Sequence, residues 1–312
     1  MTFRPSLSRA GLALFLALGA LLVFLPQADA QVRVDLGLRR SLFIRYEPVI
    51  ATVTITNLSG RDIELNNVDN HKWFSFNIVS VQQGQADSPV PPYNADYSLD
   101  PVTIPAGQSL KRAVNITPLY PITEYGIYRV RATIYEAQSR RFYSSNPPLN
   151  IEITEGRTLW EQTVGVPANQ STSDGVETRT LTLLTHRLPD QTQLYLRIQD
   201  KERGLIYCTH QLGRVVSFNK PQVEIDANND IHILQNTSPR MFLYTKVGLD
   251  GKILDRKQYS GSTESTPTMR RTVSGDFRVM GGTFLDPNQI AEEKAAPPPS
   301  VSDRPVSLPK PQ

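Results

Sequence analysis

Three aspartates in the last third of the chain are the best candidates for acid chemistry. Asp226, Asp230 and Asp276 each lie at an expected turn between two short runs of strand-forming residues. Glycoside hydrolysis needs two carboxyl groups in one cleft, because one donates a proton while the other attacks or activates water. A cleft that gathers these acids between aromatic walls would favour an enzyme or a glycan-binding protein, and acids scattered over separate exposed turns would favour a scaffold.

The first two of these aspartates frame a run that partly resembles a calcium loop. Asp226-Ala227-Asn228-Asn229-Asp230 places oxygen-bearing side chains at alternate positions. An EF-hand loop also needs glycine at its sixth position and glutamate at its twelfth, where this chain has Ile231 and Thr237. We therefore interpret the run as a β-turn that joins two strands.

Cys208 and His210 have the residue types of a nucleophile and its base. On a strand, residues two apart share a face but their backbones lie about 7 Å apart, so the side chains would have to lean together to form a hydrogen bond. We interpret them as neighbouring core positions. Cys208 is the only cysteine, so the chain has no internal disulfide, and a small buried thiol is favoured over an intermolecular bridge.

No other pattern indicates a catalytic or metal site. The chain contains no G-x-S-x-G, G-x-G-x-x-G, P-loop or H-E-x-x-H motif. The histidines lack the spacing of metal ligands; they are His71, His186, His210 and His232. We predict no catalytic, cofactor-binding or metal-ligating residue and no cofactor. Four glycosylation sequons matter only in a glycosylating secretory pathway; they begin at Asn57, Asn115, Asn169 and Asn236.

Residues 1–30 have the pattern of a secretory signal peptide. Arg4 and Arg9 form a charged start, Gly11–Leu25 is an apolar core, and Ala28-Asp29-Ala30 is a small-x-small cleavage site. The apolar run is short for a membrane anchor, so we expect cleavage and no transmembrane segment in the mature chain. The sequence therefore predicts an exported protein of the periplasm, the cell surface or the extracellular space.

The strand that organises the first half of the chain is expected at Tyr125–Ala137. Tyr128, Val130, Ala132 and Ile134 fall on one face of an extended chain, and Arg129, Arg131, Thr133 and Tyr135 fall on the other. Gly126-Ile127-Tyr128-Arg129-Val130 resembles the entry to strand F of immunoglobulin-like sandwiches, with Val130 in place of the second core cysteine. The resemblance implies a sandwich without a disulfide.

About seven short strands separated by turn residues predict a β-sandwich over residues 31–154. The pattern V-x-I-P-A-G-Q-S, at Val102–Ser109, precedes the G-x-Y-x-V strand. This combination resembles bacterial immunoglobulin-like modules of envelope and secreted proteins. The resemblance concerns the fold and carries over no site residue.

A second β-rich module is expected over residues 176–286, after a linker at 155–175, and it contains an internal repeat. Leu205–Val216 matches Phe242–Leu254, and Pro221–Leu234 matches Pro267–Met280. Each unit reads as a hairpin, a proline-led strand, an acidic turn and a strand. This is similar to the blades of β-propellers, but two units cannot close a ring that usually needs four to eight blades. The prediction is therefore an all-β chain with two propeller-blade-like repeats.

The ends and the charge of the chain add little chemistry. Residues 287–312 hold seven prolines and few apolar residues, which predicts a disordered tail. The net charge is only +3 without a dense basic run, so no nucleic-acid partner is expected.

The leading hypothesis is a non-enzymatic, exported protein that contacts an unknown protein or glycan at the cell envelope. The alternative is a small hydrolase, or an accessory module of one, that acts on an extracellular polymer through Asp226, Asp230 and Asp276. A third possibility is a homo-oligomer completed through the open sheet edge of the repeat module.

Overall fold

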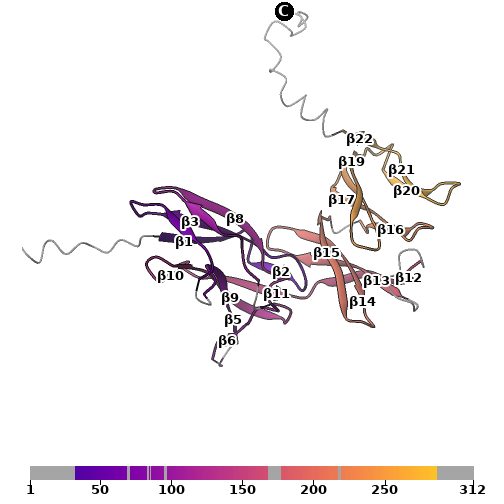
Figure 1. Cartoon of the computed structure of the whole chain (residues 1–312). Helices are drawn as coiled ribbons and strands as arrows, with labels where there is room; N and C mark the ends of the chain where they lie inside the picture. The colour runs from indigo at the N-terminus through magenta and orange to yellow at the C-terminus, as the bar shows by residue number, and fades with distance from the viewer. Residues whose placement is uncertain are drawn as a thin grey trace, which may run out of the picture. The chain divides into compact units, whose positions relative to one another are not determined.

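The computed structural model of the chain (Figure 1) describes residues 32–68, 71–82, 84, 86–94, 97–167, 177–216 and 219–286. Within these ranges every regular element is a β-strand, so the prediction of an all-β fold is confirmed. A search of the same residues finds no helix with the length and apolarity needed to span a bilayer. The predicted signal peptide, residues 1–30, and the predicted tail, residues 287–312, lie outside the described residues.

The chain forms two compact units, each of which is described by itself. The second unit takes up two short early segments, Leu42–Val49 and Ile122–Gly126, together with the chain from Glu152 onward. The first unit contains the remaining described residues up to Ile151. This boundary lies close to residue 154, where the sequence predicted the first module to end, but the two early segments were not predicted to belong to the second unit.

The first unit contains two main sheets and one small strand pair. One sheet has the order β1 (Val32–Leu38), β3 (Ile50–Asn57), β8 (Ser109–Asn115). In the other, β9 (Gly126–Glu136) pairs with β5 (Phe74–Val81), β10 (Arg141–Ser144) and β11 (Leu149–Thr154), and β6 (Ser88–Pro89) extends the edge at β5. The pair consists of β4 (Ile63–Leu65) and β7 (Val102–Ile104).

Strand β9 confirms the strand expected at Tyr125–Ala137. Its predicted inward residues, including Val130 and Ile134, are buried. Tyr135 falls on the opposite, more polar face, yet it is buried against His71 and Phe142, with its ring centroid 4.6 Å from that of His71 and 4.8 Å from that of Phe142. An aromatic side chain on the outer face of a strand can bury itself when neighbouring rings extend the apolar contact.

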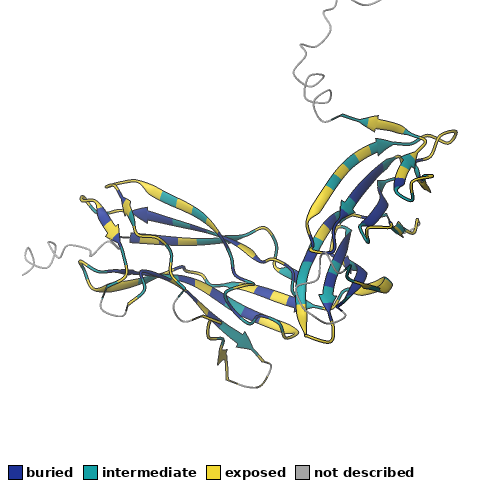
Figure 2. Cartoon of the chain, turned by 45° about the vertical axis from the view of Figure 1, so that its right-hand side comes forward, coloured by how far each residue is buried: buried dark blue, intermediate teal, exposed yellow. Residues whose placement is uncertain are grey.

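Both main sheets of the first unit have a buried face. Along the first half of β1 and of β5, buried and exposed residues alternate, as Figure 2 shows by its alternating blue and yellow segments. Alternation of this kind is what the inner faces of a sandwich require. The immunoglobulin-like arrangement of the strands stays a prediction.

The second unit opens with a four-stranded antiparallel sheet. Its order is β12 (Arg157–Gly165), β13 (Thr178–Arg187), β14 (Thr192–Asp200) and β15 (Leu205–Arg214). Residues 155–175 were predicted as a linker, but β12 lies within this stretch and pairs with β13 over its whole length. β2 (Leu42–Ile44) runs parallel to the end of β11, at Glu152–Thr154.

A second sheet follows, with one hairpin after it. The sheet has the order β16 (Gln222–Ile225), β17 (Ile231–Ser238), β18 (Met241–Val247), β19 (Ile253–Ser260) and β22 (Thr283–Leu285). The hairpin consists of β20 (Thr268–Arg271) and β21 (Phe277–Met280). The two sheets share one apolar cluster, to which Leu196 of β14 and Ile233 of β17 belong. Sequential four-stranded meanders packed in this way are blade-like.

The prediction of an internal repeat is confirmed for the second part of each unit, the proline-led strand and turn, and is wrong for the first part. Pro221 precedes the hairpin β16–β17 and Pro267 precedes the hairpin β20–β21, as predicted. Leu205–Val216 was predicted to be a hairpin like Phe242–Leu254, but β15 is one continuous strand. Gly213, with φ of +113°, lies at a register shift within β15, where the turn residue of a hairpin was expected. A glycine in a strand can mark a bulge as well as a turn.

Candidate functional site

The three predicted aspartates meet around one lysine of the second sheet. The Nζ atom of Lys246 on β18 lies 3.1 Å from Asp226 Oδ2, 3.1 Å from Asp230 Oδ2 and 3.8 Å from Asp276 Oδ1. Asp226 and Asp230 come from the turn between β16 and β17, and Asp276 from the turn between β20 and β21. We call this group, together with His232 and Tyr244, the Lys246 cluster.

A buried histidine connects the aspartates to a tyrosine. His232 on β17 lies opposite Lys246 in the β17–β18 register. Its Nε2 atom is 3.0 Å from Asp226 Oδ2 and its Nδ1 atom is 2.8 Å from the Tyr244 hydroxyl oxygen. One proton on Nε2, with the Tyr244 hydroxyl donating to Nδ1, satisfies both contacts. Phe277, which follows Asp276, packs its ring 5.4 Å from that of His232.

Two equivalent turns place the aspartates. Asp226 Oδ1 accepts hydrogen bonds from the backbone N–H groups of Asn228 and Asp230, and the Asp226 N–H donates to the Asp230 carbonyl. The turn between β20 and β21 has the same backbone bond, from Thr272 N–H to the Asp276 carbonyl. The β-turn predicted at Asp226–Asp230 is therefore confirmed. Because the repeat gives both turns one geometry, Asp230 and Asp276 are equivalent residues that reach the same lysine.

The left-handed residue of each turn explains why these two sequences can adopt it. Asn229 has φ of +63° and Gly275, its equivalent, has φ of +86°. Glycine and asparagine are the residues that tolerate this region best. The residue types at these positions therefore favour both acidic turns locally.

The electrostatics of the cluster favour a charged Asp226 carboxylate and a charged Lys246 ammonium. Burial disfavours ionisation of Asp226, but hydrogen bonds from His232, from backbone N–H groups and from Lys246 outweigh it and lower the pKa of that carboxyl. Burial likewise opposes the charge of Lys246, but the hydrogen bonds to Asp230 and Asp226 raise the pKa of its ammonium. Burial and the nearby Asp255 charge raise the pKa of the Tyr244 hydroxyl.

The cluster also contains ligand types that bind metals. One oxygen each of Asp226 and Asp276 and one nitrogen of His232 lie within 4.8 Å of one another. The Lys246 ammonium lies among the same atoms, within 4 Å of both carboxylates. A metal ion would have to displace this ammonium, which now compensates the charge of the two carboxylates. The residues present therefore fit an internal lysine counter-ion better than a metal.

The geometry does not form an open pair of catalytic carboxyls. The Asp226 side chain is only 2% exposed, and its two oxygens are held by backbone N–H groups, His232 and Lys246. A general acid needs a raised pKa, whereas that of Asp226 is lowered. Asp230 alone of the three lines the neighbouring pocket.

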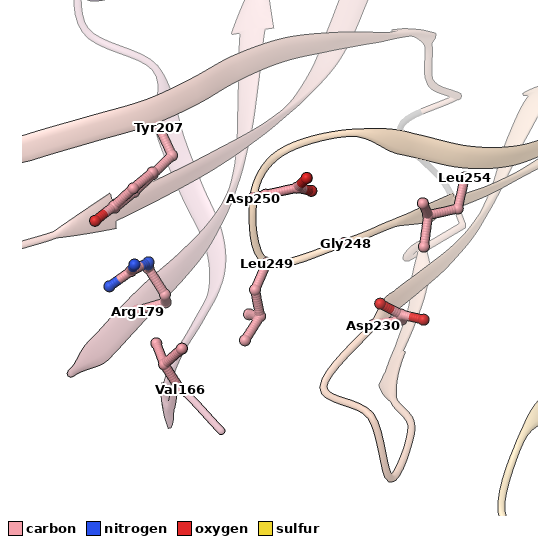
Figure 3. A pocket seen from close by; sticks show the side chains of 8 residues that line it. All are labelled: Val166, Arg179, Tyr207, Asp230, Gly248, Leu249, Asp250 and Leu254. Carbon is pink, nitrogen blue, oxygen red and sulfur yellow. The ribbon is translucent and has the colours of Figure 1, made fainter. Parts of the chain in front are cut away.

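That pocket lies in the second unit and has a volume of about 440 Å³. Figure 3 shows Arg179 of β13 and Tyr207 of β15 on one side, and Asp230, Asp250 and Leu254 of the second sheet and its turns on the other. Apolar contacts also come from two further residues, Val166 and Leu249. The volume falls within the range of small-molecule sites, of roughly 300–1,000 Å³.

Arg179 brings a positive charge to the pocket that is already compensated. The guanidinium lies 3.3 Å from Glu177 and 3.7 Å from Asp200, and it stacks over the Tyr207 ring at 4.0 Å. Arg203 bridges the same two carboxylates from the other side. Two arginines thus balance two buried acids, and the stack fixes the orientation of Tyr207.

Cys208 and His210 both lie against Gly251, in the turn between β18 and β19. His210 Nε2 contacts the Gly251 carbonyl oxygen. A Cβ atom on Gly251 would lie 2.9 Å from Cys208 Cβ, so the cysteine packs tightly against this turn. Burial raises the pKa of the Cys208 thiol to about 11, which keeps it protonated at neutral pH. The interpretation of both residues as packing positions agrees with these contacts.

The sequence did not reveal Lys246, Tyr244 and His232 as partners of the aspartates. Tyr244 and Lys246 are two apart on β18, so they share a face, and His232 is directly across from Lys246. This alternation of polar residues within an apolar strand was the available signal. Its meaning depends on the register between β17 and β18, which the sequence does not give.

Comparison with known proteins does not place the chain in a family. No protein-family model and no curated protein matches it. Among solved structures, it is similar to the sporulation control protein Spo0M from Bacillus subtilis, with 14% identity over 57% of this chain and 83% of that chain and a TM-score of 0.27. A TM-score this low does not establish a shared fold or a shared function.

Proposed function

We propose that this chain is an exported protein that binds a ligand or partner in the cell envelope or the extracellular space and catalyses no reaction. One observation carries the proposal. The three candidate acids are held by Lys246, and Asp226 also by N–H groups of its own turn, whereas the pocket beside them is open and lined by mixed apolar and charged residues. Closed charge clusters stabilise a fold, and open pockets of this composition bind ligands.

The convergence of the acids also favours a second candidate, hydrolysis of an extracellular polymer. Asp276 is half exposed and Asp230 lines the pocket, so these two could contact a substrate. In this account Lys246 would hold the carboxylates in place for catalysis. The two candidates differ in whether the purified protein releases product.

The test uses the mature chain, residues 31–312, and a panel of insoluble dyed polysaccharides. Retention of the protein on a polymer without release of dye is the result that the binding function predicts. Dye release that disappears in both Asp230→Asn and Asp276→Asn would overturn it and establish the hydrolase. Asp190→Asn, at an exposed turn of the same unit, is the control for a change of one charge.

Export is tested separately, because it depends on residues 1–30. We expect a bacterial host to deliver a chain that begins at Gln31 to its periplasm or medium, as intact mass would show. Replacing both alanines of the cleavage site, Ala28→Arg and Ala30→Arg, should leave the precursor uncut. Recovery of the uncut wild-type chain from the cytoplasm would contradict this part of the proposal.

A further inference from the structure

The pocket between β15 and the β18–β19 turn has the walls of a site for a small organic molecule. Tyr207, Leu249 and Leu254 provide apolar surface, together with Val166. Tyr207 is held in one orientation by the Arg179 stack at 4.0 Å. A wall that is ordered before binding loses little side-chain freedom when a ligand arrives.

Two carboxylates reach this pocket from different turns. Gly248 has no side chain, and a Cβ atom built on it would lie 3.0 Å from Asp250 Oδ1 and 3.7 Å from Asp230 Oδ1. The missing side chain therefore leaves space between the two acids. Asp230 uses its other oxygen, Oδ2, for Lys246 at 3.1 Å, so its Oδ1 faces the pocket.

The charges around the pocket do not cancel. On the side of the second sheet, three carboxylates surround a single ammonium, that of Lys246. On the side of the β12–β15 sheet, the charges of Arg179 and Arg203 are balanced by those of Glu177 and Asp200. Asp250 is balanced by Lys252 at 2.8 Å. An excess of negative charge beside low-dielectric walls attracts cations and disfavours anions.

We propose that this pocket binds a small organic cation, an amine on a short apolar body, with the ammonium between Asp230 and Asp250 and the apolar body against Tyr207, Leu249 and Leu254. An ammonium can donate to Asp230 Oδ1 while the hydrocarbon covers the apolar wall. The inference rests on the proposed binding function and adds the chemical class of the ligand.

The test compares three six-carbon probes in calorimetric titrations of residues 31–312 at pH 7 and low salt. Hexylamine is cationic, 1-hexanol is neutral and hexanoate is anionic. We expect hexylamine to bind in the millimolar range, at least about tenfold more tightly than hexanol, because one ion pair in a partly buried site is worth about that factor. Hexanoate should bind more weakly than hexanol.

Two variants locate the binding site. Asp230→Asn should weaken hexylamine binding about tenfold and leave hexanol binding nearly unchanged. Asp250→Asn is the second variant, because it keeps the backbone hydrogen bond from Lys252 and lies in an exposed turn, so it should fold even if Asp230→Asn does not. Asp190→Asn should bind like the wild type.

Each outcome decides the inference. Equal binding of hexylamine and hexanol, no binding of hexylamine, or unchanged binding in both pocket variants would overturn it. These failures leave the proposed function untouched, since that depends on retention and dye release by polymers. Dye release would overturn the function whatever the probes do.

Discussion

At the scale of single residues, Lys246 holds the second sheet and the β20–β21 hairpin together. It contacts carboxylates from two turns that are far apart in the sequence, and its side chain is 20% exposed. Like charges at this distance repel unless a cation lies between them. The lysine is therefore required by the acids around it, whatever ligand the pocket takes.

Replacing this lysine gives the clearest stability prediction. Lys246→Met should lower the free energy of unfolding by about 3 kcal/mol at pH 7, because it leaves partly buried carboxylates without their counter-ion. Lys257→Met is the control, since Lys257 pairs with Asp255 at the surface, and should cost less than about 1 kcal/mol. Urea unfolding measures both, and equal losses would contradict the role given to Lys246.

The shifted pKa values of Asp226 and Lys246 predict how stability depends on pH. The pKa of Asp226 is lowered in the folded protein, so its contribution is present above the unfolded value of about 4 and is lost as the pH falls through the folded value. The pKa of Lys246 is raised, so its contribution is present below about pH 10 and is lost as the pH rises through the folded value. The difference between wild type and Lys246→Met should therefore be largest between about pH 5 and 9. A difference that grows below pH 4 would contradict it.

Cys208 should react slowly as long as the chain is folded. With a pKa of about 11 it is almost fully protonated at pH 8, so alkylation should be about a hundredfold slower than for an exposed cysteine peptide. Addition of denaturant should restore the ordinary rate. Fast labelling of the native protein would show that the thiol is exposed and activated.

At the scale of elements, the turns of the second unit were the most predictable features. The hairpin predicted within Phe242–Leu254 is confirmed, because the turn between β18 and β19 has a hydrogen bond from the Gly251 N–H to the Gly248 carbonyl and φ of +84° at Gly251. The acidic turn at Asp226–Asp230 was predicted in the same way. Local residue types decide these turns, which is why sequence alone was sufficient.

Strand pairing was less predictable than turns. β12 was missed because most of its residues, such as Arg157 and Glu161, are exposed, and only Trp160 and Val164 of this strand pack against the apolar cluster. β15 was predicted to be a hairpin because a glycine such as Gly213 occurs both in turns and in β-bulges, and the sequence does not distinguish the two. The Lys246 cluster was missed for a related reason, since its members meet only through the pairing of β17 with β18 and the position of a separate hairpin.

The β18–β19 turn gives a prediction at this scale. Gly251→Ala adds backbone strain and places a methyl group 2.9 Å from Cys208 Cβ, so it should cost about 2–3 kcal/mol. Gly204→Ala is the matched control, because Gly204 has φ of +67° and open space around it, and should cost only about 1 kcal/mol. Equal losses in thermal or urea unfolding would mean that the packing against Cys208 is not tight.

At the scale of the whole molecule, the two blade-like sheets of the second unit close on each other. Leu196 and Ile233 lie in one buried cluster, so neither sheet needs a second chain to cover this face. We therefore expect residues 31–312 to be monomeric. Light scattering behind a sizing column should give the mass of one chain at every concentration, and a stable dimer would place the function at an interface between copies.

The central claim is that the acidic residues of the Lys246 cluster stabilise a binding protein and do not catalyse a reaction. An NMR titration of the Asp226 carboxyl carbon, assigned by comparison with Asp226→Asn, tests it most directly. The account predicts a pKa below the ordinary value of 3.8, because hydrogen bonds and Lys246 favour the carboxylate. A pKa raised well above that value would make Asp226 a proton donor at neutral pH, as a hydrolase requires, and would contradict the account.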